Sequence, residues 1–225
     1  MIAHLACIMD GNRRWATKQG KPPWVGHKAG ATTIKRVVKL CLDQKIEHLS
    51  LYTFSLENFN RSEIERSYLF DIIMQQAEDF LLQFVEQGIK IKFIGNLSLF
   101  PNGVQKVCKR LQEKTINGTQ LQLNFLFGYG GRQEIFAAAQ LLAQDLVAGK
   151  SITQDVFESH LWTAGTPDPD LIIRTGGVER LSNFLLYQGA YSEIRFSKTF
   201  WPDLKEEEIL EFIESSVKVQ KNIGK

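Results

Sequence analysis

The feature that most constrains the fold of this chain is a set of apolar runs, each of which ends in glycine or polar residues. The clearest runs cover residues 5–9, 49–54, 121–127 and 171–173. In open α/β sheets, ligands bind outside the carboxyl ends of the strands. The ends of these runs together supply arginines, glycines and one prominent aspartate, Asp10. Such a set suits a phosphorylated ligand with a metal ion.

Segments with helical periodicity separate these runs. Apolar residues at helical spacing predict helices around residues 34–42, 104–111, 133–148 and 205–219, and the alternation over 90–94 predicts a further strand. Strands that alternate with helices indicate βαβ units. We therefore expect an α/β fold with a central, mainly parallel sheet surrounded by helices. The chain has no internal repeat or obvious linker, so we expect a single domain over residues 1–225.

Composition excludes several classes of protein. The net charge of +2 gives no reason to expect binding to nucleic acid. The three cysteines are far apart and form no CxxC pair, which is typical of reduced thiols in a cytoplasmic protein. No apolar run is long enough to span a bilayer, and Met1 leads almost directly into the first strand, which leaves no room for a signal peptide. We expect a cytoplasmic protein with at most peripheral membrane contact.

The segment from Tyr68 to Val85 carries apolar residues on more than one helical face. A helix buried on several sides would explain this pattern. So would a helix that lines a greasy cavity with part of its surface. The sequence leaves both interpretations open.

Asp10 and Gly11 follow directly on the first apolar run. A carboxylate at a strand end is an oxygen ligand suited to Mg²⁺, which commonly takes substrate phosphates as further ligands, although a plain turn would also explain the pair. Several arginines lie at or just past predicted strand ends, namely Arg13, Arg14, Arg61, Arg132, Arg174 and Arg180. Their planar guanidinium groups suit phosphate.

The turn at residues 174–177 could form an anion-binding nest or be a simple tight turn. The chain contains no P-loop and no dinucleotide fingerprint. His27 could contact phosphate or carry a proton, or it could be structural. Glu57 and Glu193 could assist a metal ion, or they could be surface or capping residues.

Read together, several segments closely resemble the cis-prenyltransferases, typified by undecaprenyl diphosphate synthase. The matching segments are 4–16, 26–30, 51–61, 129–132, 170–177, 180–186, 191–193 and 201–203, in family order. They include Met9-Asp10-Gly11-Asn12 and the run from Ser182 to Leu186. The resemblance therefore extends from about residue 4 to about residue 204.

The resemblance implies a parallel sheet with surrounding helices and a hydrophobic tunnel. It also implies successive condensation of isopentenyl diphosphate onto an allylic diphosphate, usually farnesyl diphosphate, to give a long polyprenyl diphosphate such as undecaprenyl diphosphate. By position, it assigns catalysis to Asp10 and Asn58 and metal binding to Asp10 and Glu193. It assigns substrate binding to Gly11, Asn12, Arg13, Arg14, Trp15, His27, Ser55, Glu57, Phe59, Arg61, Arg174, Arg180 and Ser182. Mg²⁺ is the implied cofactor and a homodimer the implied assembly, with Glu193 linked to metal binding across the dimer interface.

The chain departs from the family pattern at a few positions. Pro23 stands where bacterial relatives often have a phosphate-binding arginine, and Phe59 replaces a frequent tryptophan. Arg13 stands where many bacterial members have glycine, and Val178-Glu179 replaces a more polar pair. Asn222 occupies a carboxyl-terminal position where many relatives have the arginine of an Arg-x-Gly motif. Asparagine cannot supply that positive charge, so the departure at Asn222 concerns the affinity for isopentenyl diphosphate or the nature of the dimer partner.

Two other functions fit parts of the sequence. A phosphohydrolase of the haloacid dehalogenase kind also opens with an apolar strand and an aspartate, but Ile8 occupies the position of its attacking carboxylate. The chain could instead belong to a heteromeric prenyltransferase. Non-enzymatic subunits of that kind usually lose the aspartate and arginines that this chain retains, so a catalytic subunit is the better alternative.

Overall fold

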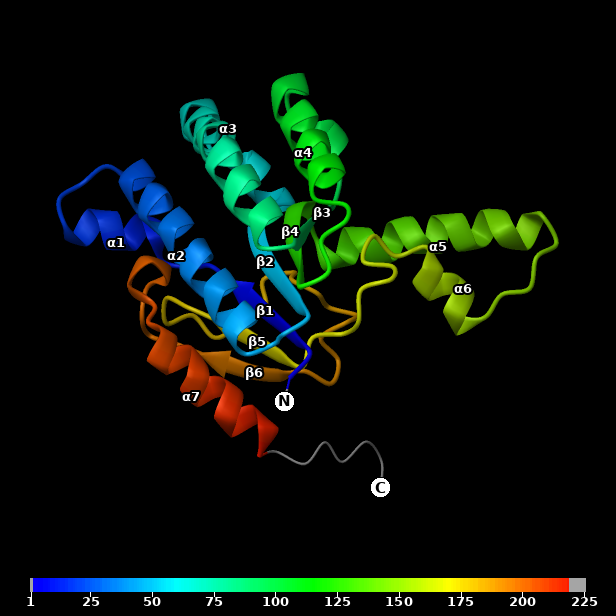
Figure 1. Ribbon diagram of the computed structural model, residues 1–225. Helices are drawn as coiled ribbons and strands as arrows, with labels where there is room; N and C mark the ends of the chain where they lie inside the picture. The colour runs from blue at the N-terminus through cyan, green and yellow to red at the C-terminus, as the bar shows by residue number, and fades with distance from the viewer. Residues whose placement is uncertain (1, 219–225) are drawn as a thin grey trace.

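The computed structural model describes residues 2–218, without the side chains of residues 78 and 79, and it is built around one six-stranded sheet (Figure 1). The strands are β1 (His4–Ile8), β2 (His48–Ser55), β3 (Ile89–Ile94), β4 (Leu121–Tyr129), β5 (Leu171–Arg174) and β6 (Glu193–Phe196). Their order across the sheet is β3-β4-β2-β1-β5-β6, and every neighbouring pair is parallel. The expected α/β fold with a parallel central sheet is confirmed.

Helices follow most of the strands. They are α1 (Asn12–Lys18), α2 (Pro23–Asp43), α3 (Glu63–Glu86), α4 (Asn102–Lys114), α5 (Gly131–Val147), α6 (Gln154–Ser159) and α7 (Glu206–Val217). Three short 3-10 turns complete this part of the chain, η1 (Leu56–Asn60), η2 (Leu97–Leu99) and η3 (Trp201–Asp203). Local signals place the helix starts: Pro23 opens α2, and the Ser62 side chain accepts a hydrogen bond from the Glu65 backbone at the start of α3.

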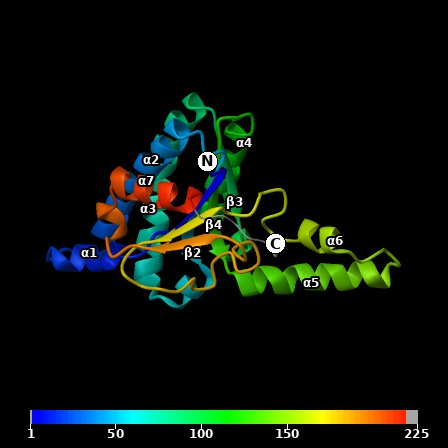
Figure 2. The same ribbon diagram turned by 90° about the horizontal axis from the view of Figure 1, so that it is seen from below.

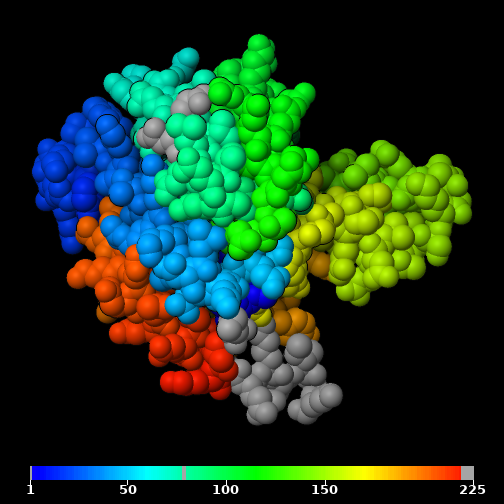
Figure 3. Space-filling model, in the orientation of Figure 1, coloured from blue at the N-terminus to red at the C-terminus, as the bar shows by residue number. Residues whose placement is uncertain are grey.

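The two faces of the sheet are covered differently. Leu5, Cys7 and their counterparts on the neighbouring strands pack against α2, α3, α4 and α7, whereas Ala6 and Ile8 face the opposite side. On that opposite side, Phe184 and Leu185 from the segment after β5 cover the sheet. Helices α5 and α6 project away from the body of the molecule. The projection is visible from below in Figure 2 and in the space-filling view of Figure 3.

The strand register fixes which residues meet at the functional edge of the sheet. Ile8 pairs with Tyr52 on β2 and with Arg174 on β5, so these three residues lie level across the sheet. Asp10 and η1 therefore extend from the same carboxyl edge that β5 reaches with Arg174. This register brings segments from the beginning, middle and end of the chain to one place.

The predicted strands and helices are present, and α2 begins well before the predicted range of 34–42, at Pro23. One strand and two helices were not predicted, namely β6, α1 and α6, each of which is short. Helix α3 includes the segment from Tyr68 to Val85. Within residues 2–218, none of the helices combines the length and apolar character that crossing a bilayer requires. The departure at Asn222 lies outside the described residues.

Candidate active site

A polar pocket of about 400 Å³ opens beyond the carboxyl end of β1. Its lining consists of Met9, Asp10, Gly11, Asn12, Arg13, Arg14, Thr17, His27 and Arg61. Helices α1 and α2 and the end of η1 bring most of these side chains to the end of the first strand. The pocket thus gathers one carboxylate, three arginines and a histidine, all predicted from the sequence as site residues.

Asp10 lies between two arginines from distant parts of the chain. Its Oδ1 accepts a hydrogen bond from Arg14 Nη2 at 3.1 Å, and its Oδ2 accepts one from Arg174 Nη2 at 2.9 Å. Burial alone would raise the pKa of Asp10, but the hydrogen bond and charge of Arg174, together with those of Arg14, outweigh burial and lower that pKa below its ordinary value. Asp10 is therefore ionised at neutral pH.

Arg174 organises a second group of polar side chains beside Asp10. Arg174 is only 4% exposed, and its Nη1 donates to Ser182 Oγ at 2.7 Å and to the backbone carbonyl of Arg180. The Ser182 hydroxyl also accepts from Arg180 Nε at 3.1 Å. The exposed Arg180 and the fixed Arg174 form a cationic group that can receive an anion. Arg14, Arg174, Arg180 and Ser182 thus lie together around Asp10, as the sequence predicts.

The backbone around Asp10 is fixed by close contacts with Thr175, Gly176 and Arg14. Thr175 Oγ1 donates to the Asp10 carbonyl at 2.7 Å. Gly176 has a left-handed φ of 86°, and a Cβ at that position would lie 2.6 Å from Arg14 Nη2. The Gly176 carbonyl in turn accepts from Arg14 Nη1 at 2.7 Å. Glycine is required at residue 176 because the turn must curve left-handed while it touches Arg14.

His27 and Arg61 contribute the opposite wall of the polar pocket. Burial, followed by the charges of Arg61 and Arg13, lowers the pKa of His27 from 6.5 to about 4, so its imidazole is neutral at pH 7. Its Nε2 atom is buried and has no hydrogen-bond partner within the part of the chain that the structure describes. Glu65 on α3 pairs with Arg61 at 3.0 Å and with Arg13 at 3.4 Å. The unpartnered nitrogen is free to bond a ligand oxygen.

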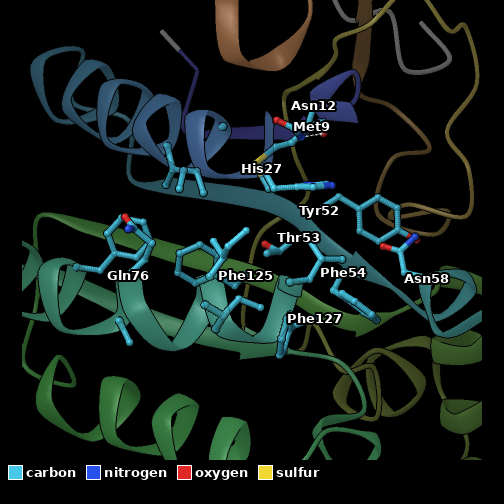
Figure 4. Close-up of a pocket in the computed structure, with 18 of the residues that line it drawn as sticks. Met9, Asn12, His27, Tyr52, Thr53, Phe54, Asn58, Gln76, Phe125 and Phe127 are labelled. Carbon is cyan, nitrogen blue, oxygen red and sulfur yellow. Dashed lines mark hydrogen bonds between the residues drawn. The ribbon is translucent and has the colours of Figure 1, made fainter. Parts of the chain in front are cut away.

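An apolar cavity of about 180 Å³ adjoins the polar pocket (Figure 4). Four residues line both spaces, namely Met9, Asn12, His27 and Arg61. In Figure 4, His27 faces the cavity from one side, and Phe125 and Phe127 of β4 lie on the other. Helix α3 closes the cavity with Leu69, Ile72, Ile73, Gln76, Ala77 and Phe80. Both interpretations of α3 hold in part, because Ala77 and Phe80 also belong to the buried core.

The turn after β2 holds several predicted residues by local contacts. Ser55 and Asn58 form a capping box in which the Asn58 Oδ1 accepts from the Ser55 backbone at 3.1 Å. Asn58 lines the apolar cavity. Glu57 is exposed and accepts a hydrogen bond from Asn183 at 2.9 Å. Ser55 and Glu57 line neither the apolar cavity nor the polar pocket.

Three predicted site residues lie elsewhere. Trp15 Nε1 donates to Asp203 at 2.6 Å, and Phe59 packs edge-on against Phe54 and Phe100. Neither lines the polar pocket or the apolar cavity. Arg132 is exposed in the first turn of α5, and its backbone N–H donates to Asn183. The structure therefore does not place these side chains with Asp10.

Glu193 begins β6, at the opposite end of the sheet from Asp10. It pairs in register with Leu171, the first residue of β5, and forms an ion pair with Arg195 at 3.3 Å. Over the described residues, His, Cys, Asp and Glu side chains form no group of three or more that could hold a metal ion. Within one chain, the structure does not bring Glu193 to Asp10.

Asp10 nevertheless has the chemistry of a Mg²⁺ ligand that relies on substrate oxygens. A carboxylate offers about four lone-pair sites, and the two arginines use one on each oxygen. The side chain is 31% exposed and faces the polar pocket. An ion held by this carboxylate and by phosphate oxygens fits the site, since Mg²⁺ commonly binds through one or two carboxylates plus substrate phosphates.

Sequence analysis missed two residues that shape the site. Thr175 secures the Asp10 backbone, and Asn183 bonds to several elements around Ser182. Asn183 has a left-handed φ of 66°, which asparagine tolerates better than most residues. That tolerance is the only local signal that could have singled it out.

The arrangement has two adjoining places for anions and one for a hydrocarbon. One cationic group surrounds the polar pocket, the other surrounds Arg174, and Asp10 lies between them. The apolar cavity begins where His27 and Arg61 end the polar pocket. Such a site can hold two phosphorylated molecules side by side, with the apolar part of one of them kept away from water.

Comparison with known proteins is consistent with this geometry. The family model described as "Putative undecaprenyl diphosphate synthase" matches residues 8–224. The isoprenyl transferase of Clostridium perfringens is 42% identical over 213 residues, which cover 93% of this chain and 84% of that protein. The (2E,6E)-farnesyl-diphosphate-specific ditrans,polycis-undecaprenyl-diphosphate synthase of Micrococcus luteus is 40% identical over 93% of this chain and 86% of its own length.

Two solved structures are similar along their whole length. One is lavandulyl diphosphate synthase from Lavandula x intermedia in complex with dimethylallyl diphosphate. It superposes with a TM-score of 0.95 at 30% identity, and the match covers 100% of this chain and 98% of the synthase chain. A probable undecaprenyl diphosphate synthase from Campylobacter jejuni gives a TM-score of 0.84, also at 30% identity, over 100% of this chain and 99% of its own.

Proposed function

The chain belongs to the undecaprenyl diphosphate synthase family of prenyltransferases, and on that premise we propose that it condenses isopentenyl diphosphate successively onto an allylic diphosphate. Farnesyl diphosphate is the proposed primer and a long-chain polyprenyl diphosphate, undecaprenyl diphosphate, the proposed product. The name of the Micrococcus luteus relative supports both choices. We further propose that residues 1–225 act as one catalytic domain in the cytoplasm, in keeping with three buried free cysteines.

The observation that carries this proposal is the continuity between the polar pocket and the apolar cavity. Met9, Asn12, His27 and Arg61 line both, so a diphosphate on one side would continue into a hydrocarbon on the other. A phosphohydrolase needs no apolar cavity beside its anion site. A prenyltransferase needs both, because its allylic substrate has a charged head and an apolar tail.

In the proposed reaction, the two cationic groups hold the two diphosphates. Arg13, Arg14, Arg61 and His27 bind the allylic diphosphate, while Arg174, Arg180 and Ser182 bind that of isopentenyl diphosphate. Their adjacency orients the double bond of one substrate toward the allylic carbon of the other. The new carbon–carbon bond forms as the allylic carbon–oxygen bond breaks, diphosphate departs, and isopentenyl diphosphate loses a proton. The arginines neutralise the charge that develops on the departing diphosphate.

We propose Mg²⁺ as the cofactor, held by Asp10 together with diphosphate oxygens. When bound, the ion would add positive charge where the leaving group becomes most negative. Arg14 and Arg174 keep Asp10 ionised, so the carboxylate is ready to accept a cation without first losing a proton. Adding EDTA to the assay described next should abolish condensation, and restoring Mg²⁺ should recover it.

The direct test is incubation of the purified protein with farnesyl diphosphate, labelled isopentenyl diphosphate and Mg²⁺. We expect labelled polyprenyl diphosphates, whose chain lengths can be read by chromatography after removal of the phosphates. Release of phosphate from simple phosphomonoesters, with no product of carbon–carbon bond formation, would contradict the proposal and favour a phosphohydrolase.

We propose that the enzyme is a homodimer. Helix α5, which projects from the body of the molecule (Figure 3), supports this proposal, because its residues Phe136, Leu146 and Val147 are 65%, 64% and 91% exposed. In a dimer, Glu193 of one chain could lie near Asp10 of the other and share its metal ion, although the two residues are far apart within one chain. Sedimentation of the protein and of a Phe136→Glu variant tests the assembly. Activity that appears only after a second protein is added would favour a heteromeric enzyme instead.

A further inference from the structure

The segment that carries Ser182 has an unusual backbone. Ser182, Asn183 and Leu185 have left-handed φ values of 50°, 66° and 41°, a region that crowds any side chain with a Cβ. Such a conformation persists only when surrounding contacts determine it, and it is often found at functional sites. The same segment presents the Ser182 hydroxyl to Arg174 and Arg180. The contacts that hold this backbone therefore decide where the hydroxyl lies.

Asn183 makes four of those contacts, and the Ser182 carbonyl also accepts from Tyr52 Oη at 3.3 Å. The Asn183 Nδ2 donates to Glu57 Oε1 at 2.9 Å and to Gln133 Oε1 at 3.0 Å. Its Oδ1 accepts from the Arg132 backbone at 2.8 Å, and its carbonyl accepts from the Gly131 backbone at 2.7 Å. One residue thus joins the Ser182 segment to η1 on one side and to the start of α5 on the other.

The start of α5 is built to receive Asn183. The N-cap of this helix is Gly130, which has no side chain to accept hydrogen bonds from the first turn, and Asn183 supplies two acceptors in its place. A Cβ on Gly130 would lie 2.7 Å from Asn183 Nδ2 and 2.4 Å from Gln133 Oε1. Gly130 has an extended backbone that any residue could adopt, so an added Cβ would act only by displacing the ends of the Asn183 and Gln133 side chains.

We propose that Asn183 is a positioning residue that sets the Ser182–Arg174–Arg180 group in register with the Glu57–Asn58 turn. It acts through Ser182. The proposal rests on the proposed function, in which Ser182 and the two arginines bind isopentenyl diphosphate. If Asn183 holds that group, its loss should weaken binding of isopentenyl diphosphate and misalign it, while the allylic pocket around Arg14 and His27 stays intact.

Asn183→Gly is the most informative variant, because glycine keeps the left-handed backbone and removes only the side-chain hydrogen bonds. Gly130→Ala disturbs the contact between Asn183 and the start of α5 by placing a methyl group next to the Asn183 side chain. Thr153→Ala serves as the matched control, since it removes the N-cap hydrogen bond to Val156 on the distant α6. Each purified variant is compared with the parental protein for the KM of both substrates, kcat and melting temperature.

We expect both site variants to raise the KM for isopentenyl diphosphate about tenfold, equivalent to about 1.4 kcal/mol, with the allylic KM changed less than about twofold. Thr153→Ala should lower the melting temperature without moving either KM. In Asn183→Gly/Ser182→Ala, the two effects should not multiply, because the asparagine acts through the serine. An unchanged KM for isopentenyl diphosphate, an equal rise in both KM values, or multiplying effects would overturn the positioning role.

A second measurement separates this proposal from the proposed function. Binding of inorganic pyrophosphate to the parental protein, Ser182→Ala, Asn183→Gly and the double variant is measured by calorimetry. If the parental protein binds pyrophosphate but makes no polyprenyl product, the proposed function fails. The role of Asn183 is then still tested, since Asn183→Gly should weaken pyrophosphate binding in the parental background and not in the Ser182→Ala background. A loss of equal size in both backgrounds would contradict the role of Asn183.

Discussion

Arg174 donates a hydrogen bond to Asp10 at 2.9 Å and thereby joins the ends of two adjacent strands that are 164 residues apart in the sequence. The arginine is buried, whereas the aspartate is partly exposed to the polar pocket. The buried cation keeps the carboxylate ionised and leaves its outer lone pairs facing the pocket. This pair therefore links the two groups of cationic residues, one on each side of Asp10.

Replacing Asp10 should remove most activity and preserve the fold. We expect Asp10→Ala to lower kcat by about 10²–10³-fold, the usual cost of losing one electrostatic contact to the transition state. Asp10→Asn, which keeps the shape and removes the charge, should lose nearly as much. Circular dichroism should show unchanged secondary structure in both variants. A folded Asp10→Ala protein that condenses at the parental rate would rule out the assigned role.

Two neighbouring glycines provide a matched comparison. Gly176 and Gly177 have left-handed φ values of 86° and 70°, so alanine at either position should cost about 1–2 kcal/mol of stability. A Cβ at Gly176 would meet Arg14, whereas at Gly177 the nearest atom is the Lys198 Cα at 3.9 Å. Only Gly176→Ala should therefore also raise the allylic KM. Urea unfolding measures the loss of stability, and steady-state kinetics measure the allylic KM. An equal rise in the allylic KM of both variants would show that the clash between a Cβ at residue 176 and Arg14 is not the cause.

Stability should fall in mild acid because of buried histidines. Burial lowers the pKa of His27 and of His4 from 6.5 to about 4, with the charges of Arg61 and Arg13 adding to the shift at His27. Below pH 6.5 the unfolded chain binds more protons than the folded one, so the free energy of unfolding decreases as pH falls toward 4. The pKa of Asp10 is lowered from 3.8, so protonation of Asp10 decreases the free energy of unfolding only at still lower pH.

The contribution of His27 can be isolated by substitution. Urea unfolding of the parental protein and of His27→Gln, measured between about pH 7 and pH 4, should show a shallower pH dependence in the variant. His4→Gln should also make the pH dependence shallower, because burial lowers the pKa of His4 as well. His4 contacts Ser50 between the strands and does not line the polar pocket. Parallel curves for parental protein and His27→Gln would show that the imidazole titrates normally in the fold.

The volume of the apolar cavity should influence product length. Ala77 on α3 lines the cavity and is buried, so Ala77→Leu places a branched side chain in space that the growing chain would use. We expect a shift to shorter products in the labelled assay. Leu82→Ala changes an exposed residue of the same helix and should leave the product distribution unaltered. Identical products from Ala77→Leu would indicate that the chain leaves by another route.

The main strands and helices could be predicted because their signals are local. The runs at 5–9, 49–54, 121–127 and 171–173 combine apolar character with a polar end, and periodicity marks the long helices. The edge strand β6 escaped prediction because Glu193 and Arg195 alternate with only two apolar residues. Helices α1 and α6 are too short to show a clear period.

Sequence alone determined which residue types stand at the strand ends, because strand length and turn chemistry are local properties. Those residues indicated a phosphorylated ligand with a metal ion, whereas the two diphosphates and the prenyltransferase reaction came from the family resemblance of the matching segments. Only the tertiary structure decided which of them meet. It placed Arg174 on Asp10, turned Trp15 toward Asp203, and set Glu193 at the opposite edge of the sheet. The reason is physical: the contacts of Arg174 with Asp10 and of Trp15 with Asp203 join segments more than a hundred residues apart, and the place of Glu193 depends on its register with β5. No local pattern records such contacts.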